Sequence, residues 1–154
     1  MKRSWTILTL ALFAASAHAA RGAAEDGKDS AAISVEGGSV SIPLETFDPC
    51  TNWLLPESDA GTSLTYNHKG TTRNKVTVQS NNPRAHFEVT VMAEATTNGV
   101  GAGRISLKQP WAHTLISDIK PGHGSASLRY EASAPAGSAA DAEEHVVTYT
   151  VLAM

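Results

Sequence analysis

From Lys75 onward, the chain repeatedly alternates apolar with polar residues, and this rhythm limits the folds open to it. The clearest runs are residues 75–79, 86–91, 127–131 and 147–151. Alternation with a period of two residues directs one set of side chains to a buried face and the other to water, as in a β-strand. The segment Ser-Asn-Asn-Pro-Arg at residues 80–84 predicts a hairpin or a corner between two sheets.

The rest of the chain supports a fold made only of strands. Seven to nine strand candidates are separated by glycine, proline and asparagine turns, and helical periodicity is confined to an ambiguous stretch at residues 139–144. Residues 33–42 predict two short strands or one kinked strand. Residues 47–56 predict a loop over one end of the core, followed by a turn at residues 57–61. This spacing indicates an antiparallel β-sandwich or barrel over residues 32–154.

The N-terminal residues have the three parts of a secretory signal peptide. Lys2 and Arg3 are followed by an uncharged, mostly apolar run and then by Ala17-His18-Ala19. The apolar run is shorter than the roughly 20 residues that span a bilayer as a helix. We therefore expect residues 1–19 to be removed by cleavage after Ala19, with Ala20 as the neighbouring site. An uncleaved membrane anchor is the alternative, and residues 20–31 are expected to form a flexible lead-in.

Charge and cysteine content narrow the partners of the processed chain. Without residues 1–19, the chain keeps 10 basic and 15 acidic residues, a net charge of −5. Such a balance gives no electrostatic reason to bind nucleic acid, and no later segment predicts a membrane span. Cys50 is the only cysteine, so it is expected to be a free thiol: half-buried in a loop, paired with a second chain, or reactive.

No pattern in the sequence predicts an enzyme, a cofactor or a metal site. The five histidines of the processed chain lack the close spacing of zinc ligands and are interpreted as exposed strand or loop residues. Gly99, Gly101 and Gly103 precede a strand-like segment and not the helix of a phosphate-binding loop. No Gly-x-Ser-x-Gly elbow is present, and Asp141, Glu143 and Glu144 are interpreted as a solvated loop.

Two tryptophans are the candidate ligand-binding residues. Trp53 and Trp111 stand beside prolines or loop residues. Exposed tryptophans on a β scaffold stack on sugar rings or anchor a protein partner. The alternative is that each ring caps one end of the core.

The segments Val76–Pro83, Phe87–Met92 and His145–Leu152 together resemble secreted bacterial β-sandwich proteins of the immunoglobulin-like, pilin-like or WxL-like kind. The chain differs from WxL domains in lacking paired Trp-x-Leu motifs, and from chaperone–usher pilins in lacking their cysteine pair. The resemblance implies an immunoglobulin-like sandwich with a structural, adhesive or assembly role at the bacterial envelope or surface, in the periplasm or outside the cell. Partners, or further copies, could be joined by β-strand addition. A carbohydrate- or ligand-binding module is the alternative.

Overall fold

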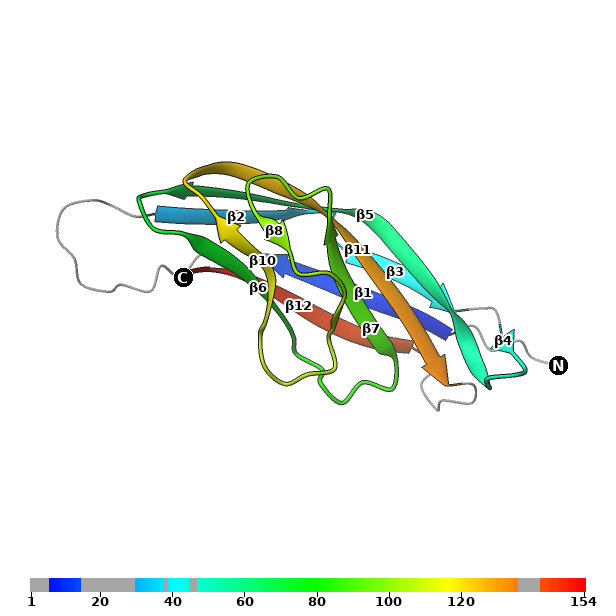
Figure 1. Cartoon of the computed structure of the whole chain (residues 1–154). Coiled ribbons are helices and arrows are strands. Elements are labelled where there is room, and N and C mark those ends of the chain that lie inside the picture. The colour runs from blue at the N-terminus through cyan, green and yellow to red at the C-terminus, as the bar shows by residue number, and fades with distance from the viewer. Residues whose placement is uncertain (1–5, 15–29, 38, 45–46, 136–141) are drawn as a thin grey trace.

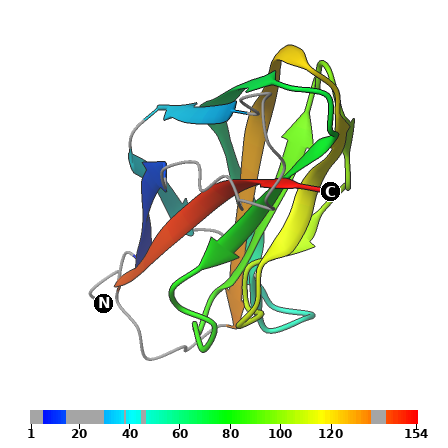
Figure 2. The ribbon, with the colours of Figure 1, turned by 90° about the vertical axis from the view of Figure 1, so that its left-hand side faces the viewer.

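A computed structural model describes residues 6–14, 30–37, 39–44, 47–135 and 142–154 of the chain. These residues form twelve strands and no helix, arranged in two layers (Figures 1 and 2). All ladders are antiparallel except the one between β1 and β12. The prediction of an all-β fold with antiparallel sheets in two layers is therefore confirmed. The described residues contain no helix long and apolar enough to cross a membrane.

The first layer, sheet A, has the strand order β3-β1-β12-β6-β10-β8. Its strands are β1 (Thr6–Ala14), β3 (Ser39–Leu44), β6 (Asn74–Ser80), β8 (Val100–Gly101), β10 (His113–Ile119) and β12 (Ala142–Ala153). The alternating runs at residues 75–79 and 147–151 thus lie beside each other, with Val78 opposite Tyr149.

The second layer, sheet B, has the order β2-β5-β11-β7-β9, with β4 on one end of β5. Its strands are β2 (Ser30–Glu36), β4 (Phe47–Asp48), β5 (Trp53–Lys69), β7 (Glu88–Glu94), β9 (Ile105–Ser106) and β11 (Gly122–Pro135). The strand β6 belongs to sheet A and β7 to sheet B, so residues 81–87 form a corner between sheets, one of the two predicted options.

The core lies between the layers and contains the inward residues of the alternating runs. Tyr130 of sheet B and Tyr149 of sheet A are fully buried, and their hydroxyl groups form a hydrogen bond across the core. Burial raises the pKa of both phenols, so both remain neutral at physiological pH. Fully buried side chains such as Phe87 and Leu64 fill the space around them.

One segment decides between two predicted options, and another differs from the structure predicted for it. Residues 33–42 form two strands in different layers, because the chain crosses from β2 to β3 at Gly37, whose φ of 121° favours glycine. Residues 53–61, predicted as the end of a loop and a turn, belong to β5 and pair with β11 as far as Trp53 opposite Pro135. Most of these residues are exposed, so they have no alternating apolar pattern for the sequence to show.

Candidate functional site

The first strand lies inside sheet A and not at its edge. Eight residues of β1, from Ile7 to Ala14, pair with β12, and six residues, from Thr6 to Ala11, pair with β3. Figure 1 shows β1 in blue between β3 and the orange-red β12. We call this place between β3 and β12 the β1 position. The strand that fills it comes from the segment that the sequence predicts to be a signal peptide.

On one side of the β1 position, β3 depends on β1 for its place in the sheet. Among the described residues, β1 is the only strand that pairs with β3. Val40, Ile42 and Leu44 of β3 are buried, whereas Ser39, Ser41 and Pro43 are exposed. A β3 strand without β1 would keep its apolar face toward the core but would lose every hydrogen bond to a neighbouring strand.

The register shows which residues a strand in the β1 position must match. Leu8 stands opposite Ile42, Leu10 opposite both Val40 and His145, and Leu12 opposite Val147. Ile42, Val147 and His145 are at most 1% exposed. Because directly opposite residues lie on the same face of a sheet, a filling strand needs apolar residues at every second position.

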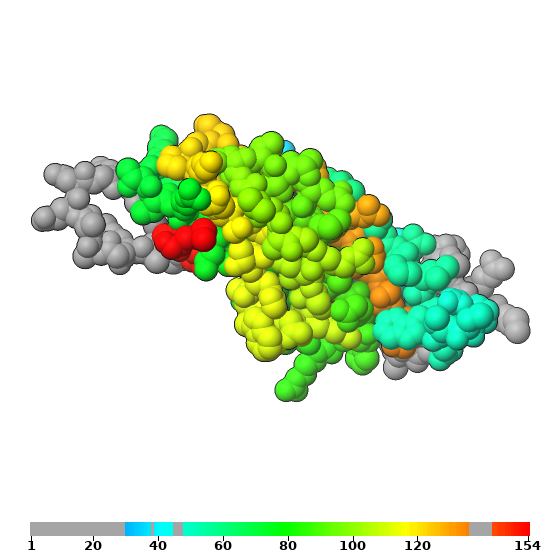
Figure 3. Space-filling view, viewed as in Figure 1, coloured from blue at the N-terminus to red at the C-terminus, as the bar shows by residue number. Residues whose placement is uncertain are grey.

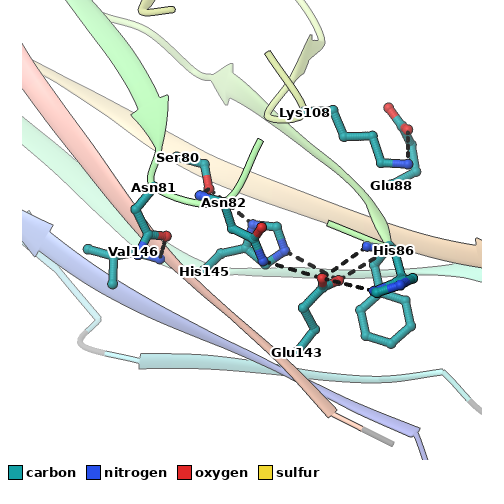
Figure 4. Close-up of polar contacts among 10 residues, drawn as sticks. Ser80, Asn81, Asn82, His86, Glu88, Lys108, Glu143, His145 and Val146 are labelled. Atoms are coloured by element: carbon teal, nitrogen blue, oxygen red, sulfur yellow. Dashed lines mark hydrogen bonds and ion pairs between the residues drawn. The ribbon is translucent and has the colours of Figure 1, made fainter. Parts of the chain in front are cut away.

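A buried polar cluster lies on β12 next to the β1 position (Figure 4). Ser80 Oγ of β6 is 3.0 Å from His145 Nδ1, and the amide of Asn82 donates to Ser80 Oγ at 3.2 Å. Glu143 accepts hydrogen bonds from the amides of His86 and Phe87, both at 2.9 Å. The cluster therefore joins the first residues of β12 to the corner between the two sheets.

The ionisation of this cluster is set by burial and by hydrogen bonds. Burial lowers the pKa of His145 despite the nearby Glu143 carboxylate, whose Oε2 lies 3.7 Å from Nε2. Burial also acts to raise the pKa of Glu143, but the hydrogen bonds donated by Phe87 and His86 outweigh it and hold that pKa below its ordinary value. A carboxylate and a neutral imidazole are thus the forms that the fold favours near neutral pH.

A serine, a histidine and a glutamate in contact resemble a catalytic triad in composition, but not in access. Ser80 is 3% exposed and His145 is 1% exposed, so the Ser80 hydroxyl is shielded from solvent. His145 Nε2 has no hydrogen-bond partner among the described residues. The arrangement fits the task of fixing residues 81–87 against β12.

Sequence reasoning did not identify this cluster, and two of its predictions were wrong. Glu143 lies in β12 and its side chain is 9% exposed, so it is not part of a solvated loop. His145 and His68 are buried, whereas His86 and His123 are exposed as predicted. His68 contacts the Thr72 carbonyl and the Asn74 amide. Within the described ranges, no group of three or more histidine, cysteine or acidic residues is arranged to hold a metal ion.

The two candidate tryptophans are exposed but stand apart. Trp53 begins β5 and is 39% exposed, and Trp111 precedes β10 and is 57% exposed. The Trp111 ring lies 6.0 Å from the His113 ring, measured between centroids. Figure 3 shows the cyan start of β5 at one end of the molecule and the yellow segment that leads into β10 nearer its middle. The structure does not combine them in one aromatic surface.

Cys50 is exposed and unpaired in the turn between β4 and β5. Its amide donates a hydrogen bond to Asp48 Oδ1 at 2.9 Å, and the Thr51 hydroxyl donates to Asp48 Oδ2. Of the three expected states of Cys50, the half-buried one is therefore wrong. The Asp48 carboxylate organises the turn that presents the thiol to solvent.

Neither protein-family models nor curated proteins supply a function by similarity. No protein-family model matches the sequence, and no curated protein matches it significantly. The function is therefore inferred from the geometry of the chain itself.

Proposed function

We propose that this chain is an exported, non-enzymatic protein with an immunoglobulin-like sandwich, which has a structural or adhesive role in the bacterial envelope and assembles by β-strand addition. One observation carries the proposal: a strand from the expected signal peptide fills an internal position of sheet A. When residues 1–19 are removed, the β1 position becomes empty, and a strand from another chain takes the place of β1.

Binding of a strand in the empty β1 position is expected to lower the free energy of the processed chain. Removing β1 leaves unpaired backbone groups along β3 and β12 and exposes the buried side chains of Val40, Ile42 and Val147. Each buried aliphatic side chain contributes about 1.5–3 kcal/mol when it is covered. An open strand position with apolar walls is a template for an added strand.

Export of the full-length chain from a bacterial host tests the proposal. Intact mass spectrometry of the exported protein is expected to show a chain that begins at Ala20 or Arg21. A lysine-flanked peptide with the sequence of residues 6–14 is then expected to bind it and raise its melting temperature. An exported protein that retains residues 1–19, or one that the peptide neither binds nor stabilises, would contradict the proposal.

The exposure of Trp53 and Trp111 supports a second candidate, a carbohydrate- or ligand-binding module. An exposed indole ring can stack on a sugar ring at little cost in free energy. Titration of tryptophan fluorescence with a panel of glycans tests this function, with Trp111→Ala as the variant and Trp53→Ala as its counterpart. Unchanged fluorescence across the panel would exclude it.

A further inference from the structure

We propose that the strand that fills the β1 position of the processed chain comes from a different protein and not from a second copy of this chain. The chain then receives a strand but does not pass one on, so it ends an assembly and does not extend it. This inference rests on the proposed function, and it adds the identity of the partner.

The β1 position sets a strict requirement on its occupant. The residues of β1 that stand opposite buried residues of β3 and β12 include Leu8, Leu10 and Leu12. His145 is buried beneath the same position, and its Nε2 has no hydrogen-bond partner among the described residues, with Glu143 Oε2 at 3.7 Å. An occupant therefore needs several large apolar residues at alternate positions and no charge among them, since an unpaired buried charge is costly.

The segment between the expected cleavage site and β2 does not meet this requirement. Residues 20–29 contain five charged residues, and the other five are alanine or glycine. One set of alternate positions includes Asp26 and Lys28, and the other includes Arg21, Glu25 and Asp29. Either set would place at least two charges, and no large apolar side chain, opposite the core.

The next segment of the chain is already used in its own fold. Residues 30–36 form β2, which pairs with β5 at seven positions, and Ile33 and Val35 pack against the core. Donating β2 to a second copy would uncover sheet B of the donor. The last strand, β12, is likewise paired with β6 of its own chain at seven positions. Neither residues 20–29 nor the described strands β2 and β12 therefore give a second copy a spare strand of the required chemistry.

The test uses the processed protein recovered after export of the full-length chain. Sedimentation velocity is expected to show a monomer over a wide concentration range. The peptide with the sequence of residues 6–14 is expected to bind at least about tenfold more tightly than a matched peptide carrying Leu8→Ser, Leu10→Ser and Leu12→Ser. If the processed chain is unfolded alone, recovery of β-structure by circular dichroism on adding each peptide replaces the binding measurement.

A gain-of-function variant completes the test. A chain whose residues 20–29 are replaced by the sequence of residues 6–14 is expected to form concentration-dependent polymers, because each copy then has an apolar strand to donate. Self-association of the unaltered processed chain that disappears when residues 20–29 are deleted would overturn this inference and leave strand addition intact. Absence of binding by the leucine peptide would instead contradict the proposed function.

Discussion

The two sheets of this molecule differ in where their strands come from. Every strand of sheet B lies at or after Ser30, and its central ladder joins β5 to β11 at twelve positions. Sheet A contains a strand from residues 6–14, and among the described strands this is the only one that pairs with β3. Under the proposed removal of residues 1–19, sheet B keeps all of its described strands, whereas sheet A loses β1.

Under the proposed function, this difference separates the strands that stabilise the domain from the position that binds a partner strand. Sheet B and the β6–β12 ladder keep most of the buried residues together, including Tyr130 and Tyr149. We expect β3 of sheet A to contribute less to stability when no strand pairs with it. Perturbations of the two regions should therefore behave differently in the full-length and the processed chain.

The largest expected effect is on the free energy of unfolding. It appears when two core truncations are each made in the full-length chain and in the processed chain. Leu64→Ala in β5 and Ile42→Ala in β3 each remove a side chain that is at most 1% exposed. Each is expected to lower the free energy of unfolding of the full-length chain by about 3 kcal/mol. In the processed chain, Leu64→Ala should cost the same, but Ile42→Ala only about 1 kcal/mol, because β3 is no longer held. Urea denaturation measures both, and equal costs in both forms would contradict the comparison.

A smaller loss of stability is expected when the contact between β12 and residues 81–87 is removed, because this contact does not involve β1. Glu143→Ala removes the acceptor of the His86 and Phe87 amides, and should cost about 2 kcal/mol in both forms. Glu144→Ala, at the exposed neighbouring residue, is the matched control and should cost less than about 0.5 kcal/mol. A Glu143→Ala cost that vanishes in the processed chain would show that the cluster depends on β1.

The smallest effect is a dependence of stability on pH through His145. Its pKa is lowered in the folded chain, so below about pH 6.5 the unfolded chain binds a proton that the folded chain does not. The melting temperature of the full-length chain should therefore fall by about 2–4 °C between pH 7.5 and 5.5.

Two histidine variants, one in each sheet, test whether His145 causes this dependence of the melting temperature on pH. His145→Gln should flatten the slope, and His123→Gln, at an exposed residue of β11, should leave it unchanged. The slope should be smaller in the processed chain, where an open β1 position admits water to His145. A slope that survives His145→Gln would assign it to other groups.

The sequence predicted the fold best where one face of a strand is buried. The runs around Val78, Val89, Tyr130 and Tyr149 are strands with the expected inward faces. The exposed half of β5 could not be predicted in this way, because residues 53–61 pair with β11 without burying an alternating face. An alternating pattern appears in a sequence only where one face of a strand is buried, and residues 53–61 are mostly exposed.

The candidate site was less predictable because it depends on contacts between distant segments. Ser80 and His145 are 65 residues apart, and Glu143 reaches amides 56 and 57 residues away. The apolar run at residues 6–14 predicts a signal peptide from its flanks, but nothing local shows that it also suits a place between β3 and β12. Only the register of the two strands shows this.

Hydrogen–deuterium exchange on the monomeric processed chain tests most directly whether the β1 position is empty. The amides of β5 and β11 should be protected, while those of β3 exchange rapidly until the peptide of residues 6–14 is added and then become protected. Protection of β3 equal to that of β5, in a monomer without peptide or partner, would show that sheet A needs no added strand.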